Sequence, residues 1–350
     1  MRVLALGPYP PPHGGVQTNL VGIRDYLRGQ GHWCGVVNLT RFRKPESDDV
    51  YYPRTALQVM RLLFGLKYDI LHLHMGGMPN RQLYALSAVA CSVPGKKTVL
   101  TFHSGGYPAS PPGRSAAPGT VRGWIFRRFD RVIVVNPELV KLFHRFGVPP
   151  ERVHLIYPHA VGPPPEAAWP DRLHEFIQGH SPFLLTVGLL ETEYDLPLLI
   201  EVLGRVRRRF PRAGLVIAGA GSLEQELGEL IRSKPYASDI LLWGDMPHPL
   251  TLRAIAGCDM LLRTTLYDGD SVAVREALGL GTPVIATDNG MRPAGVRLIP
   301  AGDPAALYAA IEQQAGAPAR PPAAAPDQRN LEAVVQLYRE LLQGNDRMQS

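Results

Sequence analysis

The chain has 350 residues, which is long for a single hydrophobic core and typical of two domains. Hydrophobic residues make up 45% and charged residues 19%, which excludes a disordered chain, and no apolar run reaches the roughly 18 residues of a membrane-spanning helix. Residues 1–160 hold 20 Lys and Arg against 8 Asp and Glu, a net charge of +12, whereas the remainder holds 17 against 23, a net charge of −6.

Short apolar runs alternate with helical patterns through the first half of the chain. The opening run, residues 1–7, is too short for a signal peptide, and we expect it to form a buried first strand. Further strands are predicted at 34–38, 69–74, 98–103, 131–135 and 153–156, and helices at 14–30 and 55–66. This alternation predicts a parallel, doubly wound sheet.

A second alternating unit follows a proline-containing stretch, 158–182, which is predicted as a linker. Strands are expected at 183–187, 214–218, 240–243, 260–265 and 283–286, and helices at 196–210, 271–280 and 330–343. The sequence therefore predicts an α/β protein with two Rossmann-like doubly wound domains that face a central cleft. We place the N-terminal acceptor domain at 1–165 with a final helix at 330–346, the nucleotide-sugar domain at 180–315, and a Pro/Ala-rich connector at 316–329.

The cysteines and histidines give no metal-ligand pattern. The three cysteines are far apart in sequence, which favours packing roles in a reducing, cytoplasmic compartment. His72 and His74 alternate on one predicted strand without a third ligand nearby, so they are interpreted as structural histidines. His103 precedes Ser-Gly-Gly at the end of a strand, which is a better position for a functional side chain.

The most informative stretch is Tyr267-Asp-Gly-Asp-Ser-Val-Ala-Val-Arg-Glu276. Its carboxylates Asp268 and Glu276 bracket a turn between the end of a strand and the start of a helix, where open α/β sheets bind ligands. Backbone N–H groups at a helix start favour an anion, and carboxylates accept hydrogen bonds from sugar hydroxyls. The stretch therefore predicts a nucleotide-sugar ligand.

The order of several motifs resembles GT-B glycosyltransferases, most closely glycosyltransferase family 4. The motifs are Gly7-Pro-Tyr-Pro-Pro-Pro-His-Gly-Gly-Val16, Asp69-Ile-Leu-His-Leu-His74, Thr101-Phe-His103, Thr186-Val-Gly188, Ile217-Ala-Gly-Ala-Gly221, Asp268-x7-Glu276 and Gly281-Thr-Pro-Val-Ile-Ala-Thr287. The resemblance implies retention of anomeric configuration, no metal and no other cofactor, and a final helix that returns to the N-terminal domain.

The resemblance also implies roles for individual residues. Glu276 would accept hydrogen bonds from the ribose, Asp268 would hold hydroxyls of the transferred sugar, and His103 would contact that sugar near the reacting carbon. Backbone N–H groups that would contact the sugar and diphosphate belong to Gly269, Asp270 and Ser271. Gly14 and Gly15 would approach the phosphate, where a side chain would obstruct it.

Two departures from the family pattern concern the diphosphate. The family's Arg and Lys after the second-domain Val-Gly are Leu189 and Tyr194 here. Among three arginines nearby, Arg292 is favoured as the replacement cation and Arg263 or Arg275 as an organiser; alternatively, all three form structural salt bridges. Arg263 lies inside a predicted strand and needs a partner, for which Asp268 and Asp270 are candidates.

The leading hypothesis is a glycosyltransferase that moves a sugar from a nucleotide-diphosphate sugar to a hydroxyl of a saccharide or lipid-linked acceptor. The alternative is a GT-B-like subunit that binds nucleotide sugars without catalysis, because the Arg and Lys are missing. A third possibility is a sugar-nucleotide epimerase. Asp268-Gly-Asp270 resembles the metal motif of GT-A enzymes, but the repeated unit argues against that fold. Gly219-Ala-Gly221 lacks the third glycine of a dinucleotide fingerprint, which disfavours a dehydrogenase.

The basic N-terminal half favours an anionic partner. An anionic membrane surface or a phosphorylated acceptor fits, with the protein peripheral on the inner membrane face, whereas no motif of a nucleic-acid-binding protein accompanies the charge. Trp124, Phe126 and Phe129 interleave with arginines, which suits either a membrane-facing surface or one amphipathic core helix. A solvated basic face is the other interpretation of the charge.

Overall fold

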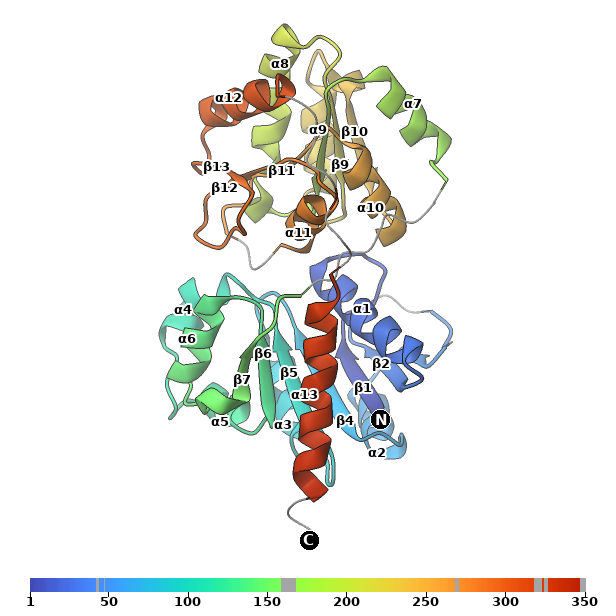
Figure 1. The fold of residues 1–350 in the computed structure, drawn as a ribbon, viewed down its shortest axis with the longest axis vertical. Coiled ribbons are helices and arrows are strands. Elements are labelled where there is room, and N and C mark those ends of the chain that lie inside the picture. Colours follow the sequence, from blue (N-terminus) through green and yellow to red (C-terminus); the bar gives the residue numbers. More distant parts are fainter. Residues whose placement is uncertain are drawn as a thin grey trace. The chain divides into compact units, whose positions relative to one another are not determined.

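The computed structural model describes residues 1–41, 44–46, 48–158, 168–267, 271–317, 323 and 327–346. The chain forms two compact units, each with its own sheet (Figure 1). Unit 1 contains the described residues up to Pro11, from Gly15 to Pro158 and from Gln328 onward; unit 2 contains those from 168 to Asp327 together with Pro12–Gly14. None of the helices in the described part of the chain is long and apolar enough to cross a membrane.

Unit 1 is built on a seven-stranded sheet in which all neighbouring strands are parallel. Its order is β3-β2-β1-β4-β5-β6-β7, with β1 (Arg2–Gly7), β2 (Trp33–Asn38), β3 (Val50–Tyr51), β4 (Ile70–Met75), β5 (Lys97–Phe102), β6 (Arg131–Val134) and β7 (Val153–Leu155). The winding direction reverses between β1 and β4, so ligands are expected beyond the carboxyl ends of these strands.

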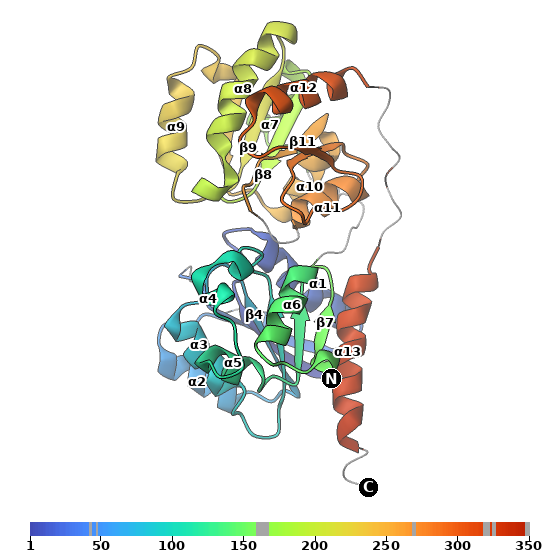
Figure 2. The same cartoon turned by 90° about the vertical axis from the view of Figure 1, so that its left-hand side faces the viewer.

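Helices cover both faces of this sheet (Figure 2). One face carries α1 (Gly15–Gly29) and α13 (Arg329–Asp346); the other carries α2 (Ala56–Gly65), α3 (Arg81–Ala90), α4 (Pro111–Arg114), α5 (Val121–Phe126) and α6 (Pro137–Arg145). Short 3-10 turns span Tyr107–Ala109 and Pro150–Arg152. The helices pack their apolar faces on central strands that are buried along most of their length, as is usual for a parallel sheet.

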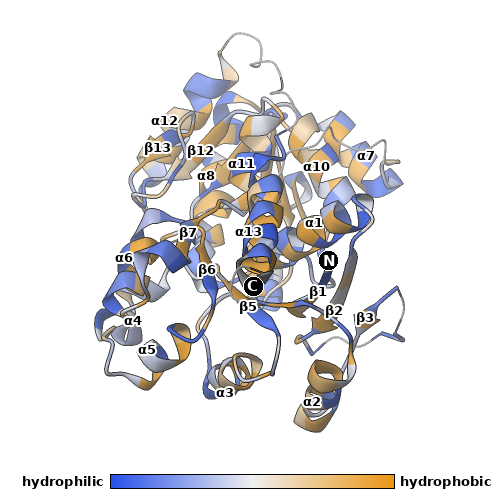
Figure 3. Ribbon diagram, turned by 60° about the horizontal axis from the view of Figure 1, so that its bottom comes forward, coloured by the Kyte–Doolittle hydropathy of each residue, from blue (hydrophilic) through white to orange (hydrophobic). Residues whose placement is uncertain are grey.

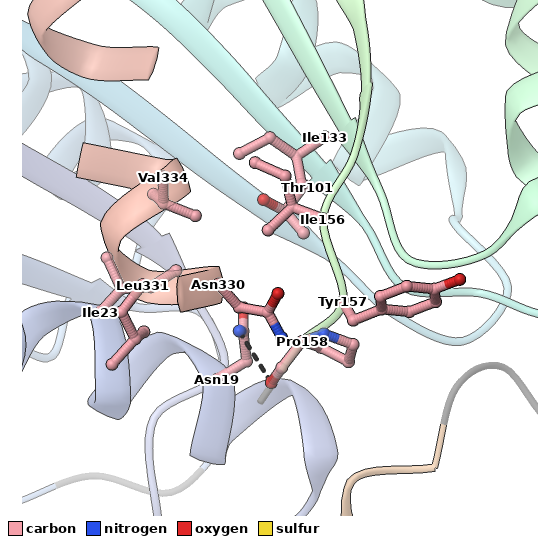
Figure 4. Close-up of a pocket in the computed structure, with 10 residues that line it drawn as sticks. All are labelled: Asn19, Ile23, Thr101, Ile133, Ile156, Tyr157, Pro158, Asn330, Leu331 and Val334. Atoms are coloured by element: carbon pink, nitrogen blue, oxygen red, sulfur yellow. Dashed lines mark hydrogen bonds between the residues drawn. The ribbon is translucent and has the colours of Figure 1, made fainter. Parts of the chain in front are cut away.

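Helix α13 packs on unit 1 through residues spaced three or four apart. The buried ones are Leu331, Val334, Val335, Leu337, Tyr338 and Leu341. Its first turn borders a cavity of about 10 Å³, which is room for about one water molecule. Figure 4 shows Asn19 of α1 beside this cavity, where its Nδ2 donates to the Pro158 carbonyl at 2.9 Å.

Unit 2 is built on a six-stranded parallel sheet of order β10-β9-β8-β11-β12-β13. The strands are β8 (Phe183–Val187), β9 (Gly214–Ala218), β10 (Ile240–Gly244), β11 (Met260–Arg263), β12 (Val284–Thr287) and β13 (Arg297–Ile299). One face packs on α8 (Leu196–Arg209), α9 (Glu224–Arg232) and α12 (Pro304–Ala315), the other on α7 (Asp171–Gly179), α10 (His248–Gly257) and α11 (Val272–Gly279). Short 3-10 turns span Thr192–Tyr194 and Ala237–Asp239. The winding reverses between β8 and β11.

The predicted α/β class with two Rossmann-like units is confirmed. The prediction of a linker over 158–182 is wrong in part, because α7 lies within it and buries Leu173 against unit 2. Prolines on either side of that segment obscured a helix with few core contacts. The edge strands β3 and β13 have two and three residues, too few for an apolar run to reveal them.

Candidate functional site

The point where the winding of unit 2 reverses holds a buried arginine. Arg263, at the end of β11, is 6% exposed and donates from Nη1 to the Val187 carbonyl of β8 at 2.7 Å. Its guanidinium carbon lies 4.6 Å from the centre of the Tyr194 ring. The structure therefore brings a cation beside Tyr194, the residue that replaces the expected lysine. Asp268 and Asp270, the partners considered for Arg263, lie outside the described residues.

Glycines allow the loops after β8 and β9 to approach each other at the same strand ends. A Cβ atom on Gly188 would lie 2.2 Å from the Tyr194 ring, and one on Gly219 would lie 1.7 Å from the Gly188 carbonyl oxygen. Gly219 also has a φ of +145°, which side-chain-bearing residues rarely adopt. The Gly219-Ala-Gly221 pattern thus serves the packing of these loops.

Arg292 folds back onto the carboxyl ends of β11 and β12. Its Nη2 donates to the Thr265 hydroxyl at 2.6 Å, and its Nε donates to the Thr287 carbonyl at 3.0 Å. The Thr287 hydroxyl donates to the Thr265 carbonyl. These threonines, which the sequence did not indicate, fix a second cation at the carboxyl ends of β11 and β12. Arg275 is partly buried on α11 itself.

The start of α11 supplies a positive helix end at this edge of the sheet. Ser271 is 6% exposed, and its hydroxyl accepts from the Val274 N–H at 3.5 Å as the helix cap. The partial positive charge of such a helix start stabilises an anion. The predicted site residues Asp268 and Gly269, like Asp270, lie outside the described part of the chain.

Glu276 is a buried carboxylate on the second turn of α11. It is 3% exposed, and its Oε1 lies 2.6 Å from Nε2 of His248, the first residue of α10. Burial lowers the pKa of His248, but the hydrogen bond to Glu276 and its charge raise it, and the net change is upward. The sequence did not indicate His248 as a site residue, because it lies 28 residues from Glu276 and no local pattern links the two.

In unit 1, the predicted residue His103 follows β5 and belongs to a cluster of three histidines. Its Nε2 lies 3.4 Å from Nδ1 of His74, whose ring centre lies 4.1 Å from that of His72. Burial lowers the pKa of His72 and of His103 to about 3, so the cluster is neutral at physiological pH. His72 is a hydrogen-bonded structural histidine, as predicted.

The two predicted glycines precede and begin α1. Gly15 is the first residue of that helix, so its N–H is one of the helix-start donors. Gly14 precedes it in the loop after β1, which is at the reversal point of the unit 1 sheet. The loop position fits a close approach of backbone to a ligand.

A metal site is not evident among the residues that the structure describes: they contain no group of three or more His, Cys, Asp or Glu side chains that could hold an ion. Asp268 and Asp270 lie outside those residues.

The chain matches two family models in succession. Residues 13–159 match glycosyltransferase family 4, and residues 181–315 match the glycosyl transferases group 1. A phosphatidyl-myo-inositol mannosyltransferase from Mycobacterium leprae is 24% identical over 89% of this chain and 86% of its own length. An uncharacterized glycosyltransferase from Methanocaldococcus jannaschii is 32% identical over 30% of this chain, and the match spans only 25% of that relative.

A solved structure with a similar fold is HepE of Anabaena in complex with UDP-glucose. It has a TM-score of 0.65 and 16% identity, and the match covers 89% of each chain. At this identity the likeness concerns the fold.

Proposed function

Because the chain is a GT-B glycosyltransferase, with successive matches to family 4 and group 1 over most of its length, we propose that it takes its sugar from a UDP-sugar and transfers it to a hydroxyl of a lipid-linked or saccharide acceptor. HepE, which has the same fold, was solved with UDP-glucose, and this supports uridine as the base. The mannosyltransferase relative is named for a phosphatidylinositol acceptor, which supports a lipid-linked acceptor.

One observation carries the donor assignment: Glu276 is a carboxylate buried to 3% exposure on α11, at the family position for ribose recognition. A buried carboxylate is costly unless it is hydrogen-bonded, and it can only accept. Two adjacent ribose hydroxyls are donors of the right kind. Glu276 therefore holds the ribose, and the start of α11, capped by Ser271, faces the diphosphate end of the same ligand.

The diphosphate needs positive charge to leave, and the usual Arg and Lys are Leu189 and Tyr194. In this proposal Arg292, held by Thr265 and Thr287, supplies that charge. Arg263 stacks on Tyr194 and orders the loop that follows β8. Arg275 is a second donor-binding candidate. Asp268 and the N–H groups of Gly269 and Asp270 would complete the donor contacts, and Gly14, Gly15 and His103 belong to the same proposal as predicted site residues.

Retention of configuration and independence of metal are parts of the same proposal. Preorganised cations and helix-start N–H groups stabilise a leaving diphosphate without an ion, provided that they are fixed before the reaction. The hydrogen bonds that fix Arg292 support this arrangement.

We also propose that unit 1 docks on an anionic membrane, which would bring a lipid-linked acceptor to the enzyme. On α2, Leu57, Arg61 and Phe64 form an outer stripe, since residues four and seven apart share a helix side. Leu57 is 60% exposed and Phe64 55% exposed, and Figure 3 shows α2 as a largely apolar helix. Trp124 of α5, 49% exposed, lies under the Arg128 guanidinium at 4.7 Å.

Apolar residues beside arginines suit the interface of an anionic bilayer, where the side chains enter the headgroup layer and the cations remain among phosphates. Helix α2 contains no Asp or Glu, so no carboxylate on this helix repels the phosphates of an anionic membrane. This surface supports the proposal of peripheral attachment, which we place on the inner membrane face.

The test of catalysis is UDP release from a panel of UDP-sugars, measured with and without short lipid-linked and free saccharide acceptors. We expect acceptor-dependent release for one sugar and its loss in Glu276→Ala. Tight UDP-sugar binding without release for any pair would instead favour the non-catalytic subunit, the alternative that the loss of the Arg and Lys motivates. Release or sugar conversion without acceptor would favour an epimerase or hydrolase.

A further inference from the structure

The carboxylate of Glu276 has a defined partner that ordinary ribose recognition does not require. Among the described residues, the one hydrogen bond of this carboxylate runs to His248 Nε2, at 2.6 Å from Oε1. The Glu276 side chain is 4% exposed and that of His248 is 34% exposed. His248 thus lies on the solvent side of one carboxylate oxygen and leaves Oε2 for another donor.

The protein holds both partners rigidly. His248 begins α10, whose first turn is tied by the Thr251 hydroxyl to the Met246 and Pro247 carbonyls, each at 3.2 Å. Helices α10 and α11 share one apolar core with β8, β11 and β12. The imidazole therefore meets the carboxylate in a fixed geometry, in contrast to an exposed ion pair between long, flexible side chains.

The chemistry of a buried carboxylate explains what this contact does. A carboxylate has two oxygens that accept hydrogen bonds. A histidine N–H on Oε1 makes a charge-assisted hydrogen bond that fixes the carboxylate and so orients its second oxygen. An oriented carboxylate oxygen can accept from a ribose hydroxyl.

We propose that His248 is a positioning residue for donor recognition: it fixes the orientation of the Glu276 carboxylate and aims Oε2 at one ribose hydroxyl. The inference rests on the proposed UDP-sugar donor and adds the residue that sets the affinity and ribose selectivity of that site. His248 does not itself contact the reacting atoms.

Calorimetric titration with UDP, 2′-deoxy-UDP and 3′-deoxy-UDP tests the proposal. His248→Ala is expected to weaken UDP about tenfold, the effect of one charge-assisted hydrogen bond. For the deoxy analogue that lacks the hydroxyl aimed at Glu276, the wild type and His248→Ala should bind alike. His248→Gln, which keeps an N–H donor without the charge, should restore part of the UDP affinity.

A second comparison separates positioning from general damage. In Glu276→Gln, a further His248→Ala change should cost no additional affinity, whereas independent effects would add. Exposed His174 on α7 provides the matched control, His174→Ala, which should bind UDP as the wild type does. Thermal unfolding of each variant checks that the fold is retained.

Equal UDP affinity of His248→Ala and the wild type would overturn the role of His248 while leaving the proposed function intact. An equal loss for UDP and both deoxy analogues would also overturn it, because the effect would then not pass through the ribose. If neither the wild type nor any variant bound UDP or another nucleoside diphosphate, the proposed function itself would fail.

Discussion

The imidazole of His72 connects the final helix to the sheet of unit 1: its Nδ1 lies 2.5 Å from the Tyr338 hydroxyl, and its Nε2 lies 2.7 Å from the Thr101 hydroxyl. His72 and Tyr338 are both fully buried and come from β4 and α13. Tyr338→Phe removes one partner and leaves a buried imidazole nitrogen unsatisfied, so we expect a loss of about 1–3 kcal/mol in the free energy of unfolding.

Urea unfolding followed by circular dichroism measures this loss. Tyr308→Phe is the matched control, because its hydroxyl meets Glu312 on the exposed side of α12 in the other unit and should matter much less. Equal stability of Tyr338→Phe and the wild type would show that this contact does not hold α13 in place.

Unit 1 should lose stability in mild acid. The pKa values of His72, which is buried, and of His103, which is half-buried, are lowered to about 3, so the folded state stays unprotonated while the unfolded state takes up protons below about 6.5. Their stability contribution is therefore complete above 6.5 and is lost as the pH falls toward 3. Each histidine contributes a slope of about 1.4 kcal/mol per pH unit.

Urea titrations at several pH values between 7.5 and 4.5 measure that slope. His72→Asn should reduce it, whereas His144→Asn, which changes an exposed histidine on α6, should leave it unchanged. A pH-independent free energy of unfolding would contradict the burial of these imidazoles.

The His248–Glu276 pair should show the opposite pH dependence. The pKa of His248 is raised in the folded state, so its contribution is present below the ordinary pKa of about 6.5 and is lost as the pH rises through the folded value. The melting temperature of His248→Gln should consequently fall furthest below that of the wild type near pH 6. Differential scanning fluorimetry from pH 6 to 9 gives the comparison, and a difference that grew with pH would refute the ion pair.

Membrane docking depends on the outer stripe of α2. Leu57→Ser combined with Phe64→Ser should reduce sedimentation with vesicles of phosphatidylglycerol and phosphatidylcholine several-fold, since the apolar area that enters the interface is lost. Arg61→Glu should weaken binding mainly at low salt. Leu298→Ser, which removes another exposed leucine from β13 in unit 2, should bind as the wild type does. Equal binding of the α2 variant would exclude this surface as the docking site.

Local sequence patterns revealed the fold more fully than the site. Parallel strands such as β4 and β5 are buried on both faces, so their apolar runs identified them, and the spacing of Ser271 and Glu276 on one helix followed from the chain itself. Helix α7 was not predicted, because prolines flank the segment and Leu173 is its one buried residue.

Contacts made across the sheet left no local signal. His248 meets Glu276 only because α10 and α11 pack side by side, and Arg292 reaches Thr265 only because β11 and β12 are neighbours. Arg263 donates to the Val187 carbonyl and stacks on the face of Tyr194, and both contacts depend on β8 lying beside β11; its predicted partners Asp268 and Asp270 lie outside the described residues. Such partners depend on strand order, which composition and periodicity do not specify.

We propose that Glu276 of unit 2 holds the ribose of a nucleoside diphosphate. Isothermal titration of UDP into the wild type, Glu276→Ala and the exposed-site control Glu226→Ala tests it most directly. We expect saturable binding to the wild type and to Glu226→Ala, and a loss of affinity of at least tenfold in Glu276→Ala with the fold intact. Unchanged UDP affinity in Glu276→Ala would contradict it.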